Sequence, residues 1–127
     1  MAEKSVAQKL MIKEGRSVLL INPPAGYDAL LGQLPAQVSV LSQPSEPVDI
    51  IQVFVANRAE LEAQLPQLKP LVKPNGMIWV TYYKGTSKTK TDIHRDTIAA
   101  YARSLDLEAV AMIAIDADWS ALRLKVV

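Results

Sequence analysis

Residues 49–85, DIIQVFVANRAELEAQLPQLKPLVKPNGMIWVTYYKG, decide the fold of this chain. Two apolar runs, residues 48–56 and residues 77–83, each have the length of a strand and lack the alternation of a strand with one wet face. A helix is predicted between them, because Asn57 and Glu60 have the spacing of a capping box. A strand, a helix and a second strand in succession predict two parallel strands that are covered on both faces.

The predicted helix contains its own interruption. Its inward-facing positions are Leu61, Leu65, Leu68 and Val72. Pro66 lies within this stripe and removes one helix hydrogen bond, which predicts a kink or two helical pieces. Residues 73–76, KPNG, are a stop signal before the second strand.

The segments before this stretch repeat the same pattern. Residues 5–13 are typical of a short helix, and Ser17–Ile21 (SVLLI) is predicted to be a buried strand. The breaker cluster at residues 22–26, NPPAG, precedes a helical stripe that begins at Tyr27. Residues 38–41 are predicted to be a short second strand. This part therefore adds two strands and two short helices.

The link at residues 42–47, between the second and third predicted strands, is too short for a crossover helix. Two alternatives remain open for it. Either the second strand is antiparallel to the third, or an extended segment crosses the sheet.

The C-terminal part predicts a helix that starts near Asp92 and two final strands at residues 109–116 and 121–127. The short turn between these strands predicts an antiparallel hairpin. The expected fold is a three-layer, Rossmann-like α/β domain over residues 1–127, with a mostly parallel sheet of about six strands that closes with this hairpin.

Composition excludes several classes of function. The chain has 127 residues, half of them apolar, which excludes a disordered chain, and its net charge of +1 excludes a globally basic nucleic-acid binder. The absence of cysteine and the single histidine exclude disulfide frameworks, thiolate zinc sites, cysteine nucleophiles and multi-histidine metal sites. Neither a signal peptide nor an apolar run of membrane-spanning length is visible, so a cytoplasmic protein without a membrane partner is expected. The apolar content permits a homodimer.

Residues 49–85 resemble one stretch of the class I S-adenosylmethionine-dependent methyltransferases. In that family an acidic residue opens a central strand, a helix follows, and a Lys-Pro-Gly-Gly-like turn leads to the next strand. Nearly the whole chain is also similar to a bacterial family of small proteins of unknown function. The segments that carry this similarity are LINPPAGY (20–27), WV (79–80), TD (91–92) and DADWSAL (116–122). The resemblance implies a methyltransferase-like Rossmann fold and no particular reaction.

The residues that would hold S-adenosylmethionine in such a fold are missing from the sequence. A cofactor-binding member would have a glycine-rich acidic turn after the first strand and a carboxylate at the end of the second strand for the ribose hydroxyls. Here the first turn has one glycine and no acid before Asp28, and no carboxylate follows the second strand before Glu46. No cofactor is therefore predicted, and S-adenosylmethionine is kept as an alternative.

The carboxyl edge of the predicted sheet is the expected ligand site, because open α/β sheets bind ligands there. The loop KGTSKTKT, residues 84–91, has three lysines before a predicted helix start, which favours an anion, although Asp92 and Asp96 would oppose one. Trp119 is either a packing aromatic or part of a pocket. The candidate ligand-binding residues are Asn22, Gly26, Tyr27, Lys84, Ser87, Lys88, Asp92 and Trp119.

The sequence favours a non-catalytic or regulatory domain that binds a small anionic ligand or a protein partner at this edge. No catalytic residue and no metal ligand is predicted, because His94 has no nucleophile or second base aligned with it, and an enzyme is not favoured. The alternatives are a divergent S-adenosylmethionine-dependent methyltransferase and weak nucleic-acid binding from Lys84 to Arg95. Nucleic acid is not the expected partner, because the chain as a whole is not basic.

Overall fold

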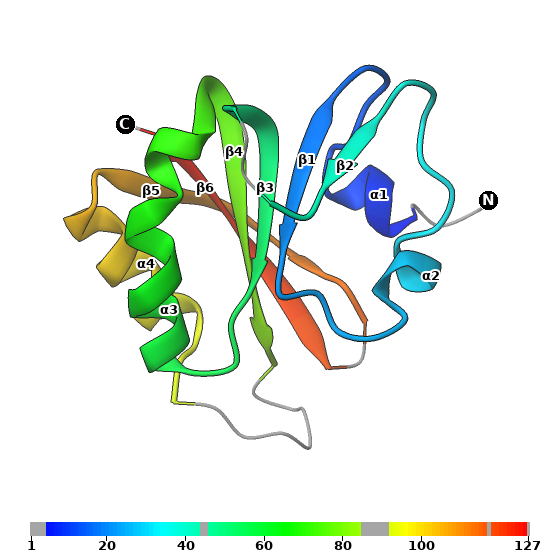
Figure 1. The fold of residues 1–127 in the computed structure, drawn as a ribbon. Helices are drawn as coiled ribbons and strands as arrows, with labels where there is room; N and C mark the ends of the chain where they lie inside the picture. The colour runs from blue at the N-terminus through cyan, green and yellow to red at the C-terminus, as the bar shows by residue number, and fades with distance from the viewer. Residues whose placement is uncertain (1–4, 44–45, 85–91, 117, 127) are drawn as a thin grey trace.

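The computed structural model describes residues 5–43, 46–84, 92–116 and 118–126. Six strands form one sheet in the order β2-β1-β3-β4-β6-β5. The strands are β1 (Ser17–Ile21), β2 (Ser39–Leu41), β3 (Val48–Phe54), β4 (Val72–Tyr83), β5 (Leu107–Ala114) and β6 (Trp119–Val126). The helices are α1 (Val6–Lys9), α2 (Tyr27–Leu31), α3 (Arg58–Gln64) and α4 (Arg95–Ser104). Helices α3 and α4 cover one face, and α1 and α2 cover the other (Figure 1).

The sheet is mostly parallel and closes with an antiparallel part, as the sequence predicts. β1, β2, β3 and β4 pair in parallel, whereas β6 pairs antiparallel with both β4 and β5. The turn between β5 and β6 is held by Asp116, whose Oδ1 accepts the backbone N–H groups of Asp118 at 2.8 Å and Trp119 at 2.9 Å. The predicted three-layer α/β fold is confirmed.

The pairing also decides the path of the link at residues 42–47. β2 is parallel to β1, so the antiparallel alternative for the second strand is wrong and the crossing segment is right. Leu41 and Ile51 both lie level with Leu19, on opposite sides of β1. The chain therefore has to return along the strand direction by only three residues, about 10 Å, before β3 begins at Val48. Six residues suffice for this return because β2 is so short.

The helix after β3 has the interruption that Pro66 predicts. The Asn57 side chain accepts the backbone N–H of Glu60 at 2.9 Å, and the Glu60 side chain accepts the backbone N–H of Ala56 at 2.6 Å. Helix α3 ends at Gln64 and continues as two short 3-10 turns, Leu65–Gln67 and Lys69–Leu71, each with a proline near its start.

Helix α4 begins later than the sequence predicts. The predicted start near Asp92 is wrong, because the first helical residue is Arg95 and the N-cap is His94. The Asp92 carboxylate accepts the backbone N–H of Arg58 at 2.7 Å instead, at the start of α3. Asp92 therefore caps a different helix, 34 residues earlier in the chain.

The stop signal at residues 73–76 forms an irregularity inside β4. Val48 pairs with Val72 and Ile50 pairs with Met77, so four residues of β4 lie outside the ladder. Gly76 lies at this point, and a Cβ there would be 2.6 Å from the Asp49 carbonyl oxygen and 2.6 Å from a Val72 methyl group. Only glycine fits such a close approach of two strands.

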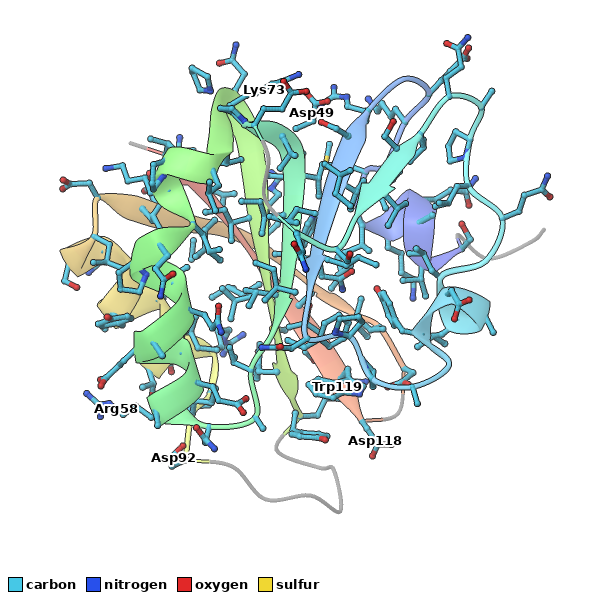
Figure 2. All side chains as sticks on the ribbon, viewed as in Figure 1. Asp49, Arg58, Lys73, Asp92, Asp118 and Trp119 are labelled. Atoms are coloured by element: carbon cyan, nitrogen blue, oxygen red, sulfur yellow. The ribbon has the colours of Figure 1, made fainter. Side chains whose placement is uncertain are left out.

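The same irregularity places Lys73 beside Asp49 at the amino edge of the sheet (Figure 2). Asp49 Oδ2 accepts the N–H of Ser17 at 2.9 Å and its hydroxyl at 3.1 Å, and Lys73 Nζ lies 3.4 Å from Asp49 Oδ1. Burial opposes the charged form of Asp49, but the bonds from Ser17 and the charge of Lys73 outweigh it and hold the pKa below its usual value. Asp49 therefore ties β1, β3 and β4 together.

Replacing Gly76 is expected to destabilise the protein through steric overlap. Gly76→Ala places a methyl group against the backbone of β3, which lowers the free energy of unfolding by about 1–3 kcal/mol. Urea unfolding checks this as a lower midpoint with an unchanged slope. Asn75→Ala, at an exposed neighbouring position, is the control and leaves the midpoint unchanged. Equal midpoints for the two variants would contradict the close approach at Gly76.

Replacing Asp49 is expected to have a pH-dependent effect. Asp49→Asn loses the ion pair with Lys73 and weakens the bonds from Ser17, which costs about 1 kcal/mol at neutral pH. Because the pKa of Asp49 is lower in the folded than in the unfolded chain, the carboxylate stabilises fully above the unfolded value of about 3.9. This stabilisation is lost as the pH falls through the folded value.

Urea unfolding at neutral and at acidic pH measures this difference between the wild type and Asp49→Asn. The gap between the two midpoints narrows in acid. Glu14→Gln, at an exposed carboxylate, serves as the control and shows no such gap. A gap that is the same at both pH values would show that the charge of Asp49 does not stabilise the fold.

Candidate functional site

The carboxyl ends of β1, β3 and β4 meet at one edge of the sheet, where β6 begins. The turn after β1, residues 22–26, is exposed along most of its length. Asn22 and Gly26 at its two ends have positive φ angles of 57° and 79°, a backbone region that glycine adopts freely and asparagine tolerates. A Cβ at Gly26 would meet no atom within 4 Å. The backbone of this turn is therefore open to a ligand.

A buried hydrogen-bond chain holds the end of this turn. The Tyr27 hydroxyl donates to Gln52 Oε1 at 2.7 Å, and Gln52 Nε2 donates to Thr81 Oγ1 at 3.0 Å. All three side chains are buried. Burial raises the pKa of Tyr27 above its usual value, with a further increase from Asp116, and these effects exceed the opposite effect of the Gln52 bond. The phenol therefore stays protonated and continues to donate.

Gln52 is a residue whose role the sequence reasoning missed. It lies at the centre of an apolar strand, which was interpreted only as a buried segment. The signal was present, because a polar amide within such a strand needs buried partners. Its partners come from 25 residues before it and 29 residues after it, so the sequence does not identify them.

Four aromatic rings form a row along the carboxyl edge. The ring of Tyr27 meets that of Phe54 edge-on, with centroids 4.7 Å apart, and Phe54 meets Trp119 edge-on at 5.2 Å. Trp119 stacks on Tyr83 at 4.0 Å. Figure 2 shows Trp119 at this edge, beside Asp118. Trp119 thus packs against the sheet and also forms part of the surface near the turn at residues 22–26.

The structure brings some of the predicted site residues together and separates others. Asn22, Gly26, Tyr27 and Trp119 lie at the edge near the aromatic row. Asp92 lies beside Arg58, away from Trp119, and its carboxylate is bound to the start of α3 (Figure 2). Ser87 and Lys88 lie outside the described residues, as does most of the segment proposed for nucleic-acid binding.

Lys84 lies at the end of β4, apart from the turn at residues 22–26. Its backbone N–H donates to the Asp118 carbonyl at 2.8 Å. Its side chain lines a cavity of about 280 Å³ between the end of β4, the start of β6 and the start of α4. Lys84 therefore belongs to a hollow that is separate from the turn at residues 22–26.

His94 has a structural role at the start of α4. Its Nδ1 accepts the backbone N–H of Asp96 at 3.3 Å, and its Nε2 lies 3.1 Å from the Thr97 hydroxyl. In the part of the chain that the structure describes, no three His, Asp or Glu side chains are grouped so that they could hold a metal. No helix among the same residues is long and apolar enough to cross a membrane.

No protein-family model and no curated protein matches this chain. Among solved structures, it is similar to a ribosomal protein L11 methylase from Lactobacillus delbrueckii subsp. bulgaricus, with a TM-score of 0.64, 11% identity and coverage of 94% of this chain and 74% of that one.

A SAM-dependent methyltransferase from Aquifex aeolicus gives a TM-score of 0.60 and 14% identity, covering 96% of this chain and 88% of its own. The fibrillarin of Aeropyrum pernix, solved with natively bound S-adenosyl-L-methionine, gives a TM-score of 0.61 and 12% identity. The match covers 94% of this chain and 72% of the fibrillarin chain.

These comparisons correct the functional prediction from sequence. The preference for a non-catalytic or regulatory domain, with an enzyme not favoured, is wrong, because two of the similar structures above are methyltransferases and the third holds S-adenosyl-L-methionine. They support the methyltransferase alternative. The prediction depended on two missing motifs in turns, whereas strand order and helix placement persist at 11–14% identity. The chain has a methyltransferase-like Rossmann fold.

Proposed function

We propose that this protein is an S-adenosylmethionine-dependent methyltransferase that binds its cofactor at the carboxyl edge of β1 and β3. The observation that carries the proposal is the match to methyltransferase structures over 94–96% of the chain. The fold alone does not fix a function, so the residues at the edge have to admit the cofactor.

The turn at residues 22–26 fits a ligand that approaches the backbone closely. Gly26 has a positive φ angle and open space where a side chain would be, and Asn22 is exposed. The buried chain from Tyr27 to Thr81 fixes the turn from below. A turn that is rigid before binding loses little entropy when a ligand orders it. Asn22 and the backbone at Gly26 would therefore hold the cofactor.

The end of β2 fits the cofactor less strongly. Ser42 and Gln43 follow β2 and are both exposed. A hydroxyl and an amide bind ribose hydroxyls through neutral hydrogen bonds, which are about half as strong as those of a carboxylate. These two residues would hold the ribose, with a weaker affinity than a member with an acid at this position.

When bound, S-adenosylmethionine would supply a methyl group on a positively charged sulfur, which makes the methyl group reactive toward an electron pair of the acceptor. The residues of this chain bind and orient the two reactants, which is the main requirement for such a transfer. The proposal keeps the cytoplasmic location expected from the sequence, which the lack of cysteine supports.

Calorimetry with S-adenosylmethionine tests the proposal, both on the wild type and on a variant that adds a carboxylate at the end of β2. Wild-type protein is expected to bind S-adenosylmethionine with measurable heat at ligand concentrations up to about 1 mM. Gln43→Glu supplies the missing carboxylate without a change of shape. It is expected to tighten binding roughly tenfold, because a charge-assisted hydrogen bond is worth about 1.5–3 kcal/mol.

The control is Gln33→Glu, which adds the same charge at an exposed position after α2 and leaves the affinity unchanged. Ser42→Asp repeats the test one residue earlier. The absence of heat with the wild type and with both β2 variants would overturn the proposal. Equal gains with Gln33→Glu would show that net charge, and not the end of β2, determines binding.

A further inference from the structure

The cavity beside Lys84 has walls from three strands and a helix. Tyr82 and Ser120 are directly paired across β4 and β6, so their side chains lie on the same face of the sheet. That face is the one covered by α3 and α4, because Tyr82 packs in the cluster that contains Leu61 and Ile98. Met112 of β5 closes the wall beside Tyr82.

Two buried hydroxyl groups in this cavity have no strong acceptor. Tyr82 is 4% exposed and Ser120 is 6% exposed. The Tyr82 hydroxyl donates to Met112 Sδ at 3.2 Å, and a thioether is a weak acceptor. Ser120 lines the cavity, and because no buried side-chain oxygen among the described residues lacks a partner, its unbonded hydroxyl is open to the cavity. Both hydroxyl groups can therefore donate to a ligand that accepts hydrogen bonds.

Burial also keeps Tyr82 in the donating form. It raises the pKa of the phenol above its usual value, and the neighbouring charges of Arg95 and Asp96 act in opposite directions. The phenol is therefore protonated at neutral pH and offers an O–H to the cavity.

Among the described residues that line the cavity, the charged side chains sum to one positive charge. Lys84 and Arg95 are cationic and Asp96 is anionic, and the Arg95–Asp96 pair is loose, with Arg95 Nε 3.8 Å from Asp96 Oδ1. Both ring nitrogens of His94 already have partners. The site therefore offers four donor groups, from Tyr82, Ser120, Lys84 and Arg95. It matches a ligand group with one negative charge, which a carboxylate has and a phosphate monoester, with nearly two, does not.

We propose that this cavity binds the carboxylate of a small acidic molecule and, resting on the proposed function, that this molecule accepts the methyl group at a different atom, through an electron pair of that atom, and keeps its carboxylate. Tyr82 and Tyr83 are successive residues of β4 and point to opposite faces. Tyr83 and Trp119 lie toward the cofactor turn, whereas Tyr82 faces the cavity. The cavity and the turn at residues 22–26 both lie at the carboxyl edge of the sheet, where the methyl donor and the methyl acceptor would meet.

Binding of benzoate tests the cavity without the cofactor. Benzamide has the same shape without the charge and is the ligand control, and inorganic phosphate is the second anion. Ligand-observed NMR titration of the wild type is expected to show binding of benzoate, weaker binding of phosphate and none of benzamide. Arg95→Gln is expected to weaken benzoate binding roughly tenfold or more, and Ser120→Ala about threefold.

The matched control is Arg103→Gln, which removes the same charge from the exposed last turn of α4. It is expected to leave benzoate binding unchanged. Equal binding of benzamide and benzoate, preference for phosphate, or equal losses in Arg95→Gln and Arg103→Gln would overturn the carboxylate site. Thermal unfolding of each variant separates loss of binding from loss of the fold.

Two further measurements separate this proposal from the proposed function. Arg95→Gln is expected to bind S-adenosylmethionine as the wild type does, because the cavity is not the cofactor site. Incubation with methyl-labelled S-adenosylmethionine and the small-molecule fraction of a bacterial extract is expected to place the label in compounds that an anion-exchange resin retains. Label only in neutral or cationic compounds would overturn the acceptor assignment, and absence of cofactor binding would overturn the proposed function while the benzoate result stands.

Discussion

The structure depends most on Gln52, which places an amide inside a strand that is buried on both faces. An unbonded amide there would cost about 1–3 kcal/mol, so both of its partners have to be in position. Thr81 satisfies it only in the observed register of β3 and β4, because a shift by one residue would turn Thr81 to the other face. Tyr27 satisfies it only if the turn after β1 returns to the sheet. One buried group thus fixes both the sheet and the candidate cofactor turn.

The two edges of the sheet use polar groups differently. At the amino edge, Asp49, Ser17 and Lys73 bind one another, so their polar groups stabilise the fold and are not available to a ligand. At the carboxyl edge, the space around the Gly26 Cα is open, and the Ser120 hydroxyl lines a cavity. The edge that Asp49 stabilises and the edge that we propose to bind ligands are therefore opposite ends of the same strands.

Local features of this chain were predictable, and contacts between distant segments were not. The strand Ser17–Ile21, the cap at Asn57 and the break at Pro66 follow from neighbouring residues, and the structure confirms them. The start of α4 was misplaced because Asp92 binds a residue 34 positions away. The cavity was likewise invisible, because the pairing that joins Tyr82 to Ser120 spans nearly 40 residues. Among the candidate site residues, the turn at residues 22–26 could be named from its position after a strand, whereas its support from Gln52 could not.

The failed prediction of a non-catalytic domain has a chemical explanation. It rested on missing motifs, on the lack of cysteine, and on the lack of a nucleophile or second base aligned with His94. Methyl transfer from an activated donor does not need a protein nucleophile, because the acceptor contributes the electron pair. The protein has to hold two molecules at the correct distance and orientation, which accounts for much of the rate enhancement in such reactions. Composition therefore excluded chemistry that methyl transfer does not need. In the proposed function, a weaker ribose contact at Ser42 and Gln43 would lower the affinity for the cofactor and would leave the proposed site in place.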